Sequence, residues 1–184
     1  MPTETEAATA TGLAIREVTA DDAPAIQAIY AHHVLHGTAS FEVVPPDLAE
    51  MTRRIADVTG KGWPYLVAEA DGHVVGYAYC TRYRPREGYR FSAEDSVYVR
   101  DDMRGRQVGR ALLGQLLQQA EAKGFRQCIA IIGDSDNAGS IGLHAAMGFR
   151  QVGIVRACGT KFGRWLDSVI MQRALGPGDS EPPA

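Results

Sequence analysis

The sequence lacks the features that mark membrane proteins, secreted disulfide-rich proteins and nucleic-acid-binding proteins. None of its apolar runs approaches the length that spans a bilayer. Its 22 acidic residues outnumber its 19 basic ones, and a net charge of −3 gives no electrostatic case for nucleic acid or an anionic membrane. Its three cysteines, Cys80, Cys128 and Cys158, are scattered and show no Cys-x-x-Cys spacing. Such a set is typical of reduced thiols, so we expect a cytoplasmic protein without disulfides or a zinc site.

Two common phosphate-binding motifs are also missing. The chain has no Gly-Lys-Ser/Thr ending a P-loop, and no Gly-x-Gly-x-x-Gly with an acidic residue on the next strand. Residues 97–113 nevertheless lead from a β-branched and aromatic run through a turn rich in Gly and Arg into an amphipathic helix. A strand that leads through such a turn into a helix makes an anion-binding site at the helix N-terminus, which we call the anion cradle. There the free backbone N–H groups and the positive end of the helix dipole point toward the bound anion. Arg104, Arg106 and Arg110 add charge for phosphate oxygens, so the sequence predicts a phosphorylated cofactor.

Hydrophobic periodicity predicts a single α/β domain over residues 13–175, with tails at 1–12 and 176–184 whose composition favours flexibility or disorder. Asp71-Gly72 is a strong hairpin turn, and Gly37, Gly124 and Gly148 end predicted helices. We expect strands at 13–18, 64–70, 73–83, 93–99, 128–132, 149–155 and 165–173. We expect helices between the cap at 19–22 and Gly37, and at 47–58, 107–123 and 137–147.

Residues 106–111, Arg-Gln-Val-Gly-Arg-Ala, match the Arg/Gln-x-x-Gly-x-Gly/Ala signature of the GNAT acetyltransferases. The order of elements resembles that family over nearly the whole of residues 13–175. Blocks at 93–99, 140–149 and 161–167 resemble the phosphinothricin and methionine sulfoximine/sulfone N-acetyltransferases within it. The third block is the most specific of these, because the general fold does not need it. The resemblance implies a mixed, mostly antiparallel sheet that splits between its fourth and fifth strands, with helices on both faces.

The resemblance also implies acetyl-CoA as co-substrate. The pantetheine arm is expected to lie in the split of the sheet and to take backbone hydrogen bonds from Val97 and Val99, while the turn at 105–110 holds the pyrophosphate. Asn137 and Ser140 resemble further CoA contacts, and Asn137 also suits a helix cap. The predicted cofactor-binding residues are Val97, Tyr98, Val99, Gly105, Arg106, Gln107, Val108, Gly109, Arg110, Asn137 and Ser140.

Acetyl transfer to nitrogen needs a neutral amine, because a protonated amine has no lone pair with which to attack. Glu94 matches the family's proposed general base, and the alternative is an exposed acid at a strand end. Asp95 competes with it, although neighbouring residues face opposite sides of a strand. His144 matches a position from which imidazole protonates the departing thiolate or assists the base, and the alternative is a structural histidine. Glu94 and His144 are therefore the predicted catalytic residues.

The acceptor site is expected to recognise a carboxylate and a tetrahedral polar group. Arg84 and Arg86 supply guanidinium forks suited to such oxyanions, and both match basic positions in the phosphinothricin-type relatives. The alternatives are a solvated loop for the arginines and ordinary core for the aromatic residues. The predicted substrate-binding residues are Phe41, Tyr79, Arg84, Pro85, Arg86, Tyr89, Asp95 and Ser96. The histidines show no metal-ligand pattern, and we expect no metal cofactor.

These observations predict an N-acetyltransferase that moves the acetyl group of acetyl-CoA to the α-amino group of a small amino-acid analogue. Phosphinothricin, methionine sulfoximine and methionine sulfone are the leading acceptors, with direct attack in a ternary complex. The alternatives are another amine (an amino acid, a protein N-terminus or a polyamine) and a non-catalytic CoA-binding module. Arg84 and Arg86 oppose a polyamine, which needs acidic walls. The relatives also imply a homodimer.

Overall fold

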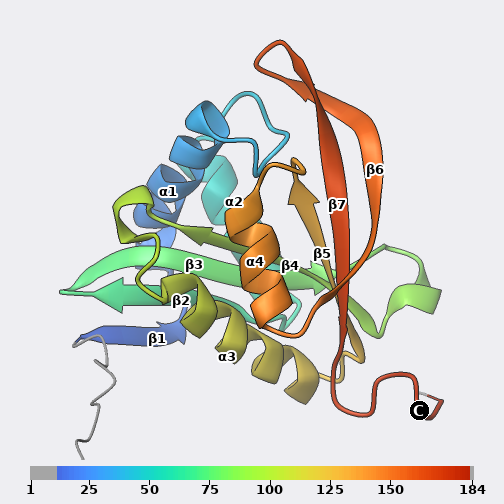
Figure 1. Ribbon diagram of the computed structural model, residues 1–184. Coiled ribbons are helices and arrows are strands. Elements are labelled where there is room, and N and C mark those ends of the chain that lie inside the picture. Colours follow the sequence, from blue (N-terminus) through green and yellow to red (C-terminus); the bar gives the residue numbers. More distant parts are fainter. Residues whose placement is uncertain (1–11, 183–184) are drawn as a thin grey trace, which may run out of the picture.

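A seven-stranded sheet forms the middle layer of the protein in the computed structural model, which describes residues 12–182 (Figure 1). The strand order is β1-β2-β3-β4-β5-β7-β6, and β4–β5 is the one parallel pair in this sheet. The strands are β1 (Leu13–Glu17), β2 (Tyr65–Ala70), β3 (His73–Arg82), β4 (Ser92–Val99), β5 (Gln127–Gly133), β6 (Arg150–Lys161) and β7 (Arg164–Ala174). The α-helices are α1 (Ala23–His36), α2 (Leu48–Gly60), α3 (Val108–Ala122) and α4 (Ala138–Ala146).

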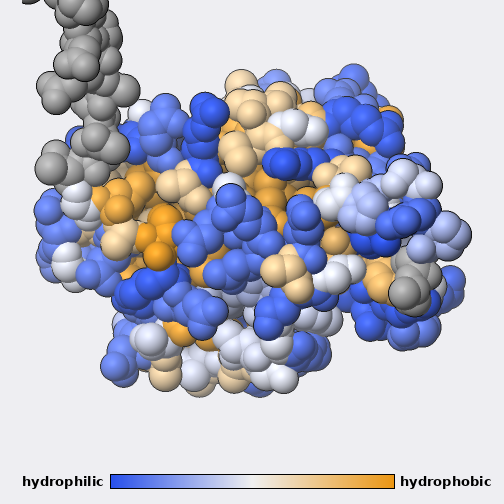
Figure 2. Space-filling view, turned by 90° about the horizontal axis from the view of Figure 1, so that it is seen from below, coloured by the Kyte–Doolittle hydropathy of each residue, from blue (hydrophilic) through white to orange (hydrophobic). Residues whose placement is uncertain are grey.

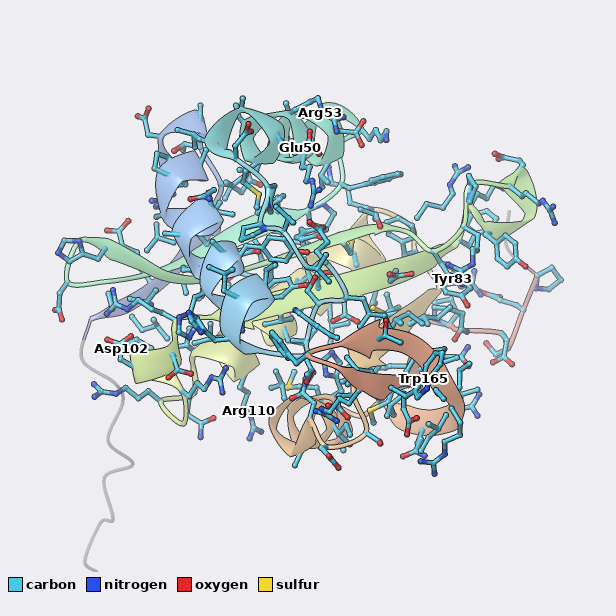
Figure 3. The ribbon with its side chains drawn as sticks, turned by 90° about the horizontal axis from the view of Figure 1, so that it is seen from above. Glu50, Arg53, Tyr83, Asp102, Arg110 and Trp165 are labelled. Carbon is cyan, nitrogen blue, oxygen red and sulfur yellow. The ribbon has the colours of Figure 1, made fainter. Side chains whose placement is uncertain are left out.

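Helices cover both faces of the sheet (Figures 1 and 3). On one face, α1 and α2 bury a core that includes Ile26, Met51 and Tyr77. On the other face, α3 buries Leu112 and Leu116, and α4 packs alongside it. These two apolar layers stabilise the sheet, because each removes the hydrophobic surface of one of its faces from water. The predicted mixed, mostly antiparallel sheet with helices on both faces is confirmed.

The sheet splits between β4 and β5. Their parallel ladder joins Ser92–Asp95 to Gln127–Ala130 and then stops, whereas β5 continues along β7 as far as Gly133. The second half of β4, residues 96–99, keeps its pairing with β3 and has no β5 partner. The predicted split between the fourth and fifth strands is therefore confirmed, and it leaves a strand edge open inside the molecule.

The hairpin of β6 and β7 is longer than the sequence predicted. We expected the first strand at 149–155, but β6 runs to Lys161, with an irregular register between Val155 and Gly159. Most side chains of β6 are exposed, so the strand lacks the alternation that would have marked it. The specific block at 161–167 consequently forms the tip of this hairpin and the start of β7.

The ends of the chain bear on the predicted tails. The N-terminal tail, apart from Gly12, lies outside the described residues. Residues 176–182 form turns after β7, and Arg126 Nε donates to the carbonyl of Gly178 at 3.0 Å; disorder of the C-terminal tail stays a prediction.

On the face in Figure 2, hydrophilic side chains surround smaller hydrophobic areas. None of the helices within residues 12–182 combines the length and apolarity needed to cross a membrane.

Candidate active site

The open half of β4 turns polar backbone groups toward the split. Tyr83 N–H donates to the carbonyl of Ser92, and Arg100 N–H donates to the carbonyl of Val75, so even-numbered residues of β4 bond β3. Backbone alternation then directs the N–H and C=O groups of Val97 and Val99 into the split. These are the groups that the resemblance predicts for the pantetheine arm.

One of these groups already has a partner that the sequence did not indicate. His33 Nε2 lies 2.9 Å from the carbonyl oxygen of Val99, and since that oxygen only accepts, Nε2 carries the hydrogen. Burial lowers the pKa of His33, which favours the neutral ring. The contact joins residues 66 positions apart, so no local pattern marks it.

A cavity of about 340 Å³ lies at the end of β4, between the turn and the starts of α3 and α4. It is lined by every predicted cofactor-binding residue except Arg106. Gly105 and Gln107 take left-handed backbone conformations with φ of 74° and 65°, which aim the turn into the N-terminus of α3. Further lining residues that the predicted set omitted are His33, Ala39, Met103, Arg104, Gly139 and Leu143. Arg110 also lines this cavity, and Figure 3 shows it on the side of the sheet away from α2.

Asn137 performs the capping role and also borders the cavity. Its Oδ1 accepts from the N–H of Ser140 at 3.2 Å at the start of α4, and its Nδ2 donates to the carbonyl of Gly133 at 3.4 Å. Ser140 lines the same cavity. The capping bond fixes the start of α4, and with it the wall of the cavity that α4 provides.

A second, narrow cavity of about 50 Å³ lies in the split itself, between β4 and the end of β5. It shares lining residues with the first cavity, including Val97, Tyr98 and Asn137, so the two cavities adjoin one another. His144 and Gly133 line its inner end. Together they form a slot that runs from an anion cradle to the middle of the sheet. A slender chain with a phosphorylated end fits this shape and this donor set.

The loop after α1 closes one side of the slot by packing on Gly133. A Cβ atom at this position would overlap the carbonyl oxygen of Thr38. We expect Gly133→Ala to lower the free energy of unfolding by about 1–3 kcal/mol, because the loop must shift to relieve the overlap. Urea denaturation measures the change. Gly142→Ala on α4 is the matched control, since its Cβ meets open space, and a loss of stability as large as that of Gly133→Ala would contradict the explanation.

Glu94 lies on the α1–α2 face of β4. Its side chain is 32% exposed, and its Oε2 is 4.0 Å from Nη1 of Arg84. Burial raises the pKa of the Glu94 carboxyl, and the nearby Asp95 charge adds to this rise, whereas Arg84 acts in the opposite direction. A half-buried carboxylate with a raised pKa is suited to take a proton from an amine.

Asp95 lies on the opposite face, where it pairs with His144. Its Oδ2 is 2.9 Å from His144 Nε2, and its Oδ1 accepts a long hydrogen bond from Cys128 Sγ at 3.6 Å. His144 Nδ1 is 2.7 Å from the carbonyl of Ser140, so both ring nitrogens have acceptors. Burial disfavours a charged ring, but the Asp95 carboxylate outweighs it and raises the pKa of His144. The structure thus joins Asp95 to His144, away from the other predicted substrate-binding residues.

The remaining predicted substrate-binding residues fall into two groups. Tyr79 pairs with Ser96 across β3 and β4, beside Glu94, and Arg84 stacks on the ring of Tyr83 at 4.3 Å. In the other group, Phe41 packs on Gly159 of β6, and Pro85, Arg86 and Tyr89 are exposed on the crossing to β4. The Tyr89 ring packs edge-on against Tyr83, with ring centroids 5.8 Å apart.

The block at 161–167 holds the two loops that border the slot. Lys161 is buried, and its Nζ donates to the carbonyl of Ser40 at 2.8 Å. Asp167 accepts from Ser135 Oγ at 2.7 Å, and Arg164 donates to Asp134. The hairpin tip thereby connects the loop after α1 to the loop after β5, a role that the sequence alone did not indicate.

The comparisons with known proteins agree with this geometry. A family model described as an acetyltransferase (GNAT) domain matches residues 15–170. A phosphinothricin N-acetyltransferase of Alcaligenes faecalis is 57% identical over 169 residues, covering 92% of this chain and 86% of its own. A methionine sulfoximine/methionine sulfone acetyltransferase of Pseudomonas aeruginosa is 44% identical, covering 91% and 98%. The crystal structure of a phosphinothricin acetyltransferase from Sinorhizobium meliloti with acetyl-CoA superposes with a TM-score of 0.91 at 44% identity, covering 95% and 94%.

Proposed function

The chain belongs to the GNAT acetyltransferase family, and from that premise we propose that it transfers the acetyl group of acetyl-CoA to the α-amino group of a small amino-acid analogue. Phosphinothricin, methionine sulfoximine and methionine sulfone are the acceptors, since relatives named for them are 44–57% identical. The observation that carries the proposal is the slot, which joins an anion cradle to the part of β4 around Ser96, two residues from Glu94 on the same face of the strand.

The residues that line the slot match the parts of CoA in their chemical type and in their order along the slot. The N–H groups of the turn at 105–110 would hold the pyrophosphate, and Arg110 adds charge there. The inward groups of Val97 and Val99 would hold the pantetheine arm, for which His33 would release the Val99 carbonyl. The bound cofactor supplies an acetyl thioester.

Glu94 acts as the general base in this proposal. It takes a proton from the acceptor ammonium, and the neutral amine attacks the thioester carbonyl directly while both substrates are bound. The new C–N bond would form as the C–S bond breaks, and CoA would leave as the thiolate. Arg84, 4.0 Å from Glu94, supplies the guanidinium that pairs with the acceptor carboxylate.

His144 supports the reaction from the other face of β4. Both ring nitrogens are occupied, by Asp95 and by the Ser140 carbonyl, which favours a role in fixing the wall of the slot. Direct proton donation to a thiolate requires His144 to leave one of these partners. A homodimer in the cytoplasm remains part of the proposal, supported by the resemblance.

A panel of acceptors tests the proposal through CoA release. The panel contains phosphinothricin, methionine sulfoximine, methionine sulfone, free amino acids, a polyamine and a peptide N-terminus. We expect turnover on the three analogues that exceeds turnover on the polyamine and the peptide. Binding of acetyl-CoA without turnover on any amine would instead favour a non-catalytic CoA-binding module.

A further inference from the structure

A third cavity, of about 270 Å³, lies on the α1–α2 face of the sheet. Its floor is a stack of tyrosine rings, Tyr65, Tyr77 and Tyr79, with centroids 4.9–6.4 Å apart. Its roof is α2, including Arg54. The volume is just below the range of pockets for drug-sized ligands.

Two hydroxyl groups on this floor lack a protein partner. Tyr65 is 5% exposed and Tyr77 is 1% exposed, and neither hydroxyl makes a hydrogen bond to any residue within 12–182. Their neighbour Tyr30 differs, because its hydroxyl contacts Ser40 Oγ at 2.8 Å and Glu42 at 2.9 Å. In the described part of the chain, no side-chain oxygen sealed from solvent is left unpaired, so the Tyr65 and Tyr77 hydroxyls each keep some accessible surface, and both residues line the cavity. Buried phenols usually find partners, and these two are left for a ligand.

The cavity adjoins the proposed catalytic carboxylate. Tyr79 and Thr81 line it, and their partners across the β3–β4 ladder are Ser96 and Glu94. Side chains of directly paired residues lie on the same face about 5 Å apart. An amino acid whose ammonium group meets Glu94 can therefore extend its side chain into the cavity.

The charges around the cavity are already balanced. Arg53 and Arg54 both pair with Glu50, at 2.8 Å in each case, and Arg54 also pairs with Glu42 at 2.7 Å. Figure 3 shows Glu50 and Arg53 together on α2. Asp57 pairs with Lys61 at 2.7 Å. Burial raises the pKa of Tyr65 and of Tyr77, which keeps both hydroxyls protonated. The cavity thus offers neutral donors and no spare cation.

We propose that this cavity receives the side chain of the acceptor amino acid, and that the Tyr65 and Tyr77 hydroxyls donate hydrogen bonds to the oxygens of an uncharged tetrahedral group such as a sulfone. The inference rests on the proposed function and specifies how that site selects its acceptor. A side chain without such oxygens leaves both donors unpaired, which is the strongest way for a pocket to reject an analogue.

The test compares methionine sulfone with methionine, which has the same carbon skeleton without the oxygens. In Tyr65→Phe and Tyr77→Phe, we expect kcat/KM for methionine sulfone to fall about 5- to 50-fold through a raised KM. The kcat/KM for methionine should rise instead, because the variants remove donors that methionine leaves unpaired. The KM for acetyl-CoA should stay unchanged. Without ligand, both variants should melt at or above the wild-type temperature, because no partner loses a hydrogen bond; Tyr30→Phe, which breaks two, should melt lower.

The outcomes separate this inference from the proposed function. Wild-type protein that releases no CoA with methionine sulfone overturns both. Wild-type turnover on the sulfone, with the sulfone-to-methionine preference intact in both variants, overturns the inference alone. A large loss of preference for phosphinothricin with none for the sulfone shows that the cavity takes an anionic group, and overturns the assignment of an uncharged one.

Discussion

Replacing Glu94 with Gln lowers turnover by about 100- to 10,000-fold at neutral pH and leaves acetyl-CoA binding unchanged, because positioned general bases contribute rate factors of that size. The amide keeps the size of the side chain but cannot take up the proton of the acceptor ammonium. Glu94 lies outside the residues that line the slot, so the cofactor should bind as before. Steady-state CoA release and a direct acetyl-CoA titration measure the two effects.

The pH profile sharpens this prediction. Burial raises the pKa of Glu94, so the acid limb of kcat/KM should fall as the carboxylate is protonated below that raised value. The pH profile of Glu94→Gln should lack this acid limb. The difference in rate between the variant and wild type should shrink at alkaline pH, because more of the acceptor amine is already deprotonated. Glu69→Gln, at a carboxylate on β2 that pairs with Arg16, is the control. Equal rates in Glu94→Gln and wild type would remove Glu94 from the mechanism.

Asp95→Ala should produce the largest loss of stability, about 3 kcal/mol in the free energy of unfolding near pH 6. The Asp95 and His144 side chains are 1% and 4% exposed, so the substitution strands a buried imidazolium and also removes the acceptor for Cys128. The His144 ring can lose its proton in the variant, which limits the loss of stability. Urea denaturation of the variant against wild type gives the difference.

The loss should depend on pH in a direction set by His144. Its pKa is raised in the folded state, so the charged pair stabilises the protein fully below the unfolded value, about 6.5, and this contribution fades as pH rises through the raised value. Only the protonated ring can donate to both Asp95 and the Ser140 carbonyl. The deficit of Asp95→Ala should therefore be widest at acid pH. A double-mutant cycle with His144→Ala isolates the pair, and simple additivity would contradict the coupling.

Local signals carried most of the fold prediction. Asp71-Gly72 sets the β2–β3 hairpin, and the helix expected at 47–58 is found as α2. The predicted cradle residues are consecutive in sequence, so a short motif was enough to name residues that the structure places around one cavity. The alternation of side chains along a β-strand also predicted that Glu94 and Asp95 face opposite sides of the sheet.

The parts that sequence could not give depend on long-range packing. The contact of His33 with Val99 and that of Lys161 with Ser40 join distant segments through side chains whose residue types are common in other roles. The tyrosines under α2 fit ordinary core periodicity, and nothing in that pattern separates a paired hydroxyl from an unpaired one. The sequence did not predict the full length of β6, because an exposed strand shows no alternation of apolar and polar residues.

The open edge of β4 has a consequence for handling the protein. Residues 96–99 present unpaired strand groups in the middle of a sheet, and such an edge is a template for another extended chain. Here His33 covers the carbonyl of Val99. A ligand that occupies the edge stabilises the fold by about 2.7 kcal/mol at 100 times its Kd. Concentrated stocks of this protein should therefore resist aggregation better when stored with CoA than without it.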